Sequence, residues 1–111
     1  MSNISTHILD TALGKPAAQV RVWLELSHNQ QWQTLVESCT DADGRVGDLT
    51  PSGLTAGHYR LCADLGSYFA AAGRDTLYAT AIIDFVISDA TQHYHLPLLV
   101  APYAYSTYRG S

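Results

Sequence analysis

The chain has 111 residues, of which 14% are charged and 47% hydrophobic, and its formal net charge at pH 7 is −4. A chain of this length forms one domain, residues 1–111, and can bury a single hydrophobic core. It has no basic stripe that could bind phosphates, so neither nucleic acid nor a membrane is expected as a partner. The low charge instead favours association with further copies, which would cover apolar surface.

The N-terminal sequence, the hydrophobic runs and the cysteines indicate the cellular compartment. The N-terminal residues Met1 to Asn3 lack the basic and apolar segments of a secretory signal, and no apolar run approaches the ~20 residues of a membrane span. Cys39 and Cys62 have neither metal-site nor redox-motif spacing. We therefore expect a cytoplasmic protein with both thiols reduced.

The first half of the chain is patterned as β-strands. Residues 4–10 predict a short strand, and residues 20–26 alternate strictly, with valines and leucines on one face. A polar connection over residues 27–31 leads to a returning strand over residues 32–38. Residues 41–44 predict a turn whose glycine supplies a positive φ.

The second half adds further strands and the helical signal of the sequence. Residues 67–73 predict a short helix, with Ser67 as its N-cap and Gly73 as its stop. Further strands are predicted over residues 59–64, 80–88, 93–100 and 103–107. About seven short strands and one short helix predict a mostly β fold, an antiparallel two-sheet sandwich.

Two histidines on one predicted strand are candidates for chemistry. His93 and His95 project from the same strand face, roughly 6–7 Å apart. This spacing suits a zinc pair, two hydrogen-bonding groups in one pocket, or ordinary surface histidines. An imidazole with a pKa of about 6.5 can take a proton from water at neutral pH.

Isolated polar residues elsewhere carry weaker signals. His7 lies on the short N-terminal strand, where a lone histidine is typical of a polar strand edge. Arg45 follows the turn glycine, and its guanidinium could hold carbonyls or an anion if that turn faces a cleft. The turn does not fit a calcium loop, because its glycine comes two positions early and no glutamate follows at the required distance. The sequence also lacks a nucleophile elbow, a phosphate loop and a dinucleotide fingerprint.

Four segments together resemble the motifs of one enzyme family. They are residues 4–17, 43–45, 93–99 and 105–111. In this order they are similar to motifs of the 5-hydroxyisourate hydrolases, the transthyretin-related enzymes of urate breakdown. The terminal tetrapeptide Tyr108-Arg109-Gly110-Ser111 is the specific part of the resemblance, since transthyretin proper has the same sandwich without it.

The resemblance implies a fold, an assembly and a reaction. The fold would be the transthyretin-like two-sheet antiparallel sandwich with one short helix. The assembly would be a homotetramer with active sites in a channel where pairs of subunits meet. The substrate would be 5-hydroxyisourate: water adds to a ring carbonyl, a C–N bond opens, and 2-oxo-4-hydroxy-4-carboxy-5-ureidoimidazoline forms. No cofactor or metal would be required.

The resemblance also implies site residues. Catalytic groups would be His7, Arg45, His95 and Ser111, and substrate would also be held by Tyr108 and Arg109. Either His95 or His7 would act as general base, while the other would polarise the substrate or return the proton to the leaving nitrogen. Arg45 would stabilise the developing oxyanion. Ser111 offers a hydroxyl and a carboxylate, and Arg109 binds either substrate or that terminus.

Two alternatives remain open at this point. One is a non-enzymatic transthyretin-like protein that binds a small aromatic ligand, although the polar His7, Arg45 and His95 set disfavours an apolar pocket. The other is a zinc-dependent hydrolase or zinc carrier, in which His7, His93 and His95 hold the metal and leave a position for water.

Overall fold

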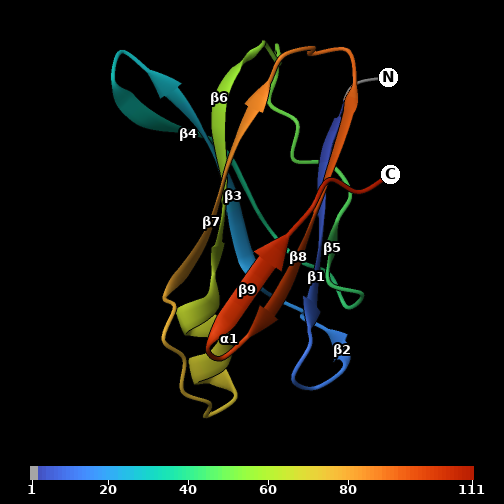
Figure 1. Ribbon diagram of the computed structural model, residues 1–111, viewed down its shortest axis with the longest axis vertical. Coiled ribbons are helices and arrows are strands. Elements are labelled where there is room, and N and C mark those ends of the chain that lie inside the picture. The colour runs from blue at the N-terminus through green and yellow to red at the C-terminus, as the bar shows by residue number, and fades with distance from the viewer. Residues whose placement is uncertain (1–2) are drawn as a thin grey trace.

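Two β-sheets face each other in the computed structural model, which describes residues 3–111 (Figure 1). The first sheet contains β1 (Asn3–Asp10), β2 (Lys15–Pro16), β5 (Arg45–Val46), β8 (His93–Ala101) and β9 (Ala104–Thr107). The second sheet contains β3 (Arg21–His28), β4 (Gln31–Cys39), β6 (Gly57–Asp64) and β7 (Thr80–Ile87). The short helix α1 (Leu65–Ala71) connects β6 to β7. The predicted mostly β sandwich with one short helix is confirmed. Residues 1 and 2, part of the N-terminus discussed above, lie outside the described residues.

The hydrophobic core lies between the two sheets. Val22 and Leu24 of β3 are buried, whereas Arg21, the first residue of the strand, is exposed, as the alternation predicts. Tyr59 of β6 and Phe69 of α1 are also buried in this core. β3 therefore gives one face to the core and leaves the other face for other contacts.

Two local features differ from the sequence prediction. The connection between β3 and β4 is shorter than expected, because both strands continue to a turn of Asn29 and Gln30, which have φ values of 51° and 64°. The helix begins earlier than expected, and Asp64 rather than Ser67 is its N-cap. The Asp64 carboxylate accepts a hydrogen bond from the Ser67 backbone N–H at 3.0 Å, and a charged acceptor satisfies a free helix donor well.

The strand order brings distant segments of the chain together around β1. β8 pairs with β1 in parallel, while the other paired strands run antiparallel. This register places Ser5 opposite His95. On the other side of β1, β5 pairs antiparallel and places Arg45 opposite His7. The N-terminal strand thus pairs with both β5 and β8, two of the other segments that carry the predicted site.

Both cysteines are free thiols, as predicted. Cys39 is exposed, and Cys62 is buried on the second sheet. Burial raises the pKa of the Cys62 thiol to about 12, so this thiol stays protonated at neutral pH. Between residues 3 and 111, no helix has the length and apolarity needed to cross a membrane.

Candidate active site

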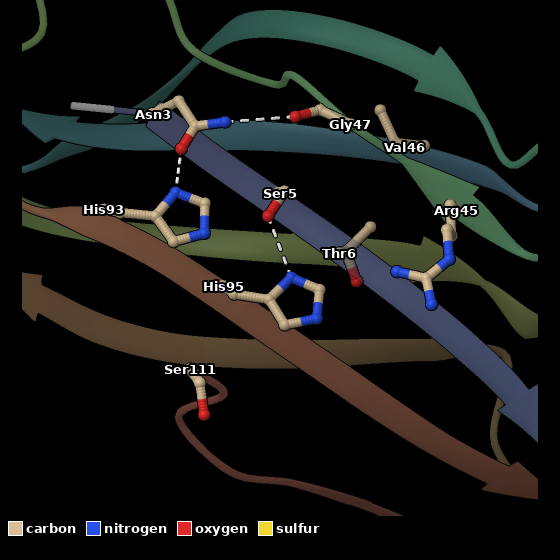
Figure 2. A pocket seen from close by; sticks show the side chains of 9 residues that line it. All are labelled: Asn3, Ser5, Thr6, Arg45, Val46, Gly47, His93, His95 and Ser111. Carbon is tan, nitrogen blue, oxygen red and sulfur yellow. Dashed lines mark hydrogen bonds between the residues drawn. The ribbon is translucent and has the colours of Figure 1, made fainter. Parts of the chain in front are cut away.

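A polar pocket lies on the outer face of the first sheet (Figure 2). Its volume is about 250 Å³. Its lining consists mainly of short polar and basic side chains from β1, β5, β8 and the C-terminal tail: Asn3, Ser5, Thr6, Arg45, Val46, Gly47, His93, His95 and Ser111. The pocket therefore contains three of the four predicted catalytic residues, Arg45, His95 and Ser111.

Two pairs of residues between β1 and β8, separated by the Ile4–Tyr94 pair, hold the two histidines. Asn3 bonds His93 through its side chain, and the Ser5 hydroxyl lies 2.8 Å from Nδ1 of His95 (Figure 2). The two imidazole rings are nearly parallel, with centroids 6.3 Å apart and an interplanar angle of 8°. The predicted projection of His93 and His95 from one strand face is confirmed.

Hydrogen-bond partners fix the proton position on two histidines. The Asn3 amide donates to the Gly47 carbonyl at 3.1 Å, so its oxygen faces His93 and accepts from Nδ1–H. Nε2 of His7 lies 2.9 Å from the Asp43 carbonyl, which can only accept, so this nitrogen also carries a proton. His7 is not among the pocket residues, and its Nε2–H is already engaged.

His95 differs from both in its partner, which is a hydroxyl and not a carbonyl oxygen. Among residues 3–111, no group hydrogen-bonds to its Nε2, while Nδ1 is held by Ser5. Burial lowers the pKa of the His95 imidazole below its ordinary value. Coulombic interactions with His93, Arg45 and His7 lower this pKa further. A neutral imidazole with a free Nε2 can take a proton from water.

The turn before β5 positions Arg45 at the pocket edge. Gly44 has a φ of 75°, and a Cβ there would lie 2.4 Å from the Ile8 carbonyl oxygen. Its backbone N–H donates to the Asp41 carbonyl, and the Asp41 carboxylate accepts from the Arg45 backbone N–H at 2.9 Å. This tight turn fixes the backbone of Arg45, and its exposed guanidinium reaches the pocket lining.

The C-terminal tail closes one side of the pocket. The Gly110 backbone N–H donates to the His95 carbonyl at 2.8 Å, which forms an isolated antiparallel bridge to β8. A Cβ on Gly110 would lie 2.5 Å from Cδ2 of His95 and 3.2 Å from the Pro97 ring. Only glycine permits this close approach, which brings Ser111 to the pocket.

Two predicted substrate-binding residues lie elsewhere within the chain. Tyr108 and Arg109 line a separate cavity of about 300 Å³ beside β7. The Arg109 guanidinium donates to the Gln92 side chain at 2.9 Å and to the His93 carbonyl at 3.0 Å. It also lies over the Tyr94 ring, 4.6 Å from the centroid. The structure therefore does not bring Tyr108 or Arg109 to the pocket of their own chain.

A metal site was one of the alternatives for the histidines. Within the part of the chain that the structure describes, no three His, Cys, Asp or Glu side chains are grouped closely enough to hold a metal ion. His7, His93 and His95 hence do not form a zinc site within one chain.

Ser5 and Asn3 were missed in the sequence analysis. Both lie on the same face of β1 as His7, because side chains two residues apart on a strand share a face. That alternation was a usable signal for their orientation. They bond His95 and His93 because β1 pairs with β8 in parallel. The sequence predicts an antiparallel sandwich, and antiparallel pairing of these strands would not give this register.

Comparison with known proteins places the chain in a family. A sequence model of the HIUase/Transthyretin family matches residues 4–110. The chain belongs to this family. The 5-hydroxyisourate hydrolase of Caulobacter vibrioides is 47% identical over 115 residues, and the match covers 100% of both chains. The family-model match thus includes every pocket residue except Asn3 and Ser111, and it reaches Gly110 of the tail.

Solved structures of this family share the fold. The structure of Klebsiella pneumoniae 5-hydroxyisourate hydrolase matches with a TM-score of 0.88 and 46% identity, covering 98% of this chain and 99% of that one. Sea bream transthyretin in complex with thyroxine matches with a TM-score of 0.91 and 27% identity, covering 97% and 94%. Because hydrolases and thyroxine-binding transthyretins share this sandwich, the pocket residues and not the fold distinguish their functions.

Proposed function

We propose that this chain hydrolyses 5-hydroxyisourate to 2-oxo-4-hydroxy-4-carboxy-5-ureidoimidazoline. The observation that carries the proposal is the pocket, where a histidine with a free Nε2 lies with an arginine and the chain terminus. The full-length similarity to proteins named 5-hydroxyisourate hydrolase supports the substrate. In this scheme residues 1–111 act as one domain in the cytoplasm, with no cofactor.

The proposed mechanism uses His95 as the general base. Its Nε2 takes a proton from water as the water oxygen adds to a ring carbonyl of the substrate. The Arg45 guanidinium stabilises the negative charge that develops on the carbonyl oxygen. His95 then returns the proton to the ring nitrogen as the C–N bond breaks. His7 and Ser111 would orient the substrate, His7 through its Nδ1 and Ser111 through its hydroxyl or carboxylate.

We further propose that four copies assemble and complete the site. β7 and β9 lie at sheet edges, and apolar side chains such as Val86 and Tyr108 are 67% and 59% exposed. Such edges and apolar patches favour association. The pocket volume of about 250 Å³ is below the roughly 300 Å³ at which ligand sites usually begin, which supports a site that another copy completes. Tyr108 and Arg109 would then act toward the pocket of a neighbouring copy.

The ultraviolet decay of 5-hydroxyisourate, generated in place by urate oxidase, tests the proposal. Because this compound hydrolyses slowly without an enzyme, the unaided rate is the control. We expect decay to accelerate in proportion to the protein and to persist in chelator. Loss of the acceleration in chelator would favour the zinc hydrolase instead. No acceleration by a folded protein would favour a small-ligand binding protein, the alternative that the match to the thyroxine complex keeps open.

The pH dependence of the reaction should report on His95. The base works in its neutral form, and its pKa is lowered from 6.5 by burial and neighbouring positive charges. The value of kcat/KM should therefore stay high at pH 7 and fall only below about pH 6.5. Measuring kcat/KM from about pH 5 to 8 checks this. An acid limb centred above 6.5 would contradict the assignment of His95 as base.

Gly110→Ala should reduce turnover without unfolding the chain. The added methyl would meet Cδ2 of His95 at 2.5 Å, so the ring or the tail must shift. We expect kcat to fall by about tenfold or more, because a displaced base aligns poorly with water. Steady-state kinetics and thermal unfolding would be measured together. Gly66→Ala is the matched control, since its nearest contact is an ordinary 3.5 Å and its helix favours alanine. Equal kinetics in both variants would refute this role of the tail.

A further inference from the structure

The Ser5 hydroxyl and the His95 ring form an isolated pair. The parallel register places Ser5 on β1 opposite His95 on β8, with Oγ 2.8 Å from Nδ1. Ser5 is only 7% exposed but lines the pocket, so its hydroxyl hydrogen can still be donated to water there. Among residues 3–111, His95 is the hydrogen-bond partner of this hydroxyl, and no other is present. Within the described residues, Ser5 is therefore the group that donates a hydrogen bond to Nδ1 or accepts one from it.

The partner of His95 differs in kind from those of the other two histidines. His93 and His7 face amide and backbone carbonyl oxygens, which only accept hydrogen bonds. A serine hydroxyl can either donate or accept. If Ser5 donates to Nδ1, the neutral ring carries its proton on Nε2, which then cannot act as a base. If Ser5 accepts from Nδ1–H, the Nε2 lone pair faces the pocket.

We propose that Ser5 is a positioning residue whose hydroxyl accepts the Nδ1–H of His95 and so keeps Nε2 free for the attacking water. This inference rests on the proposed hydrolysis. As the water O–H bond breaks, Nε2–H forms and the oxygen bonds the carbonyl carbon. The ring is then an imidazolium whose Nδ1–H stays bonded to Ser5. When the C–N bond breaks, the Nε2 proton moves to the leaving nitrogen and the ring becomes neutral again.

The groups around His95 disfavour its imidazolium form, so a hydrogen bond that stabilises this form matters for catalysis. His7 on β1, Arg45 on β5 and His93 on β8 all disfavour a positive charge on the ring. Ser111, whose terminal carboxylate carries the opposite charge, is among the residues that line the same pocket. A hydrogen bond from a charged donor is stronger than a neutral one, so acceptance by Ser5 stabilises the imidazolium selectively.

Ser5→Ala tests the proposal through the pH profile. Loss of the acceptor should lower kcat about 10- to 100-fold, the size expected for one hydrogen bond to a charged group. KM should change little. The acid limb of kcat/KM should move to lower pH, because the imidazolium loses its acceptor. An acid limb that stays in place or moves to higher pH would overturn the proposal, whatever happens to kcat.

Two further measurements keep the test independent of folding and of activity. Ser38→Ala removes a hydroxyl from a strand of the other sheet and should leave the kinetics and the pH profile unchanged. In the unsubstituted protein, ¹⁵N NMR of the histidines at neutral pH should show His95 protonated at Nδ1. Protonation at Nε2 would overturn the proposal even if Ser5→Ala failed to fold. Because NMR needs no substrate, an inactive protein would refute the hydrolase function separately.

Discussion

His95→Asn is expected to lower the turnover of 5-hydroxyisourate by about 10²- to 10⁴-fold, the usual contribution of a positioned general base. Asparagine keeps a polar side chain that can still bond Ser5, but it cannot take a proton from water. The side chain is half-buried at the pocket, so the fold should persist. The decay assay would give kcat, and circular dichroism would report the fold.

His28→Asn provides the matched control for that substitution. His28 is exposed at the end of β3, on the other sheet, and should be replaceable without effect on turnover. His7→Asn completes the comparison, because His7 was the other candidate base. A near-normal rate for His95→Asn together with a collapse for His7→Asn would transfer the role of base to His7.

Asp10→Asn is expected to destabilise the fold by about 3 kcal/mol, because it removes one partner of a buried ion pair. The Asp10 side chain is fully buried, and its carboxylate accepts from Arg74 at 2.6 Å and from Tyr68 at 2.8 Å. It also accepts from the Leu13 backbone N–H at 3.0 Å. Asparagine retains one of the two oxygens and turns an NH₂ group toward these donors. Denaturant unfolding at a fixed protein concentration would measure the loss.

Asp75→Asn is the control for this carboxylate. Asp75 is exposed beside Arg74 in the sequence, and its replacement should change stability by no more than about 0.5 kcal/mol. Asp10 lies at the far end of β1 from Ser5, so a folded Asp10→Asn variant should keep most of its turnover. Equal stability of the two variants would show that the buried ion pair does not hold the fold.

The effect of Asp10→Asn should itself depend on pH. Burial raises the pKa of Asp10, but hydrogen bonds from Arg74 and Tyr68 outweigh this and hold the pKa below its ordinary value. A carboxyl with a lowered folded pKa contributes stability above its unfolded pKa of about 3.9 and loses it as the pH falls. The stability difference between the two proteins should therefore shrink below about pH 4. A constant difference down to pH 2 would contradict this explanation.

The candidate site was predictable only where the sequence carries it in local motifs. Arg45, His95 and Ser111 were assigned from segments that resemble the family, and the structure places all three at one pocket. Their chemical roles stay predictions. Tyr108 and Arg109 came from the same terminal motif, yet within the chain they line another cavity. A motif gives the identity of a residue, while its direction depends on the path of the backbone.

Sequence alone determined the strands and which side chains share a face. Strand alternation is local, so it correctly predicted the buried face of β3 and the projection of His93 and His95 from one strand face. The positive φ of Gly44 was predictable for the same reason, because turn chemistry depends on adjacent residues.

Tertiary structure decided which strands became neighbours. The parallel pairing of β1 with β8 joins Ser5 to His95 across 90 positions of the chain, and no local pattern encodes that choice of partner. The contact of Gly110 with the His95 ring arises in the same way. Strand pairing is chosen by the packing of the whole core, which buries the apolar faces of both sheets at once. The proton state of His95 is therefore a property of the assembled sheet.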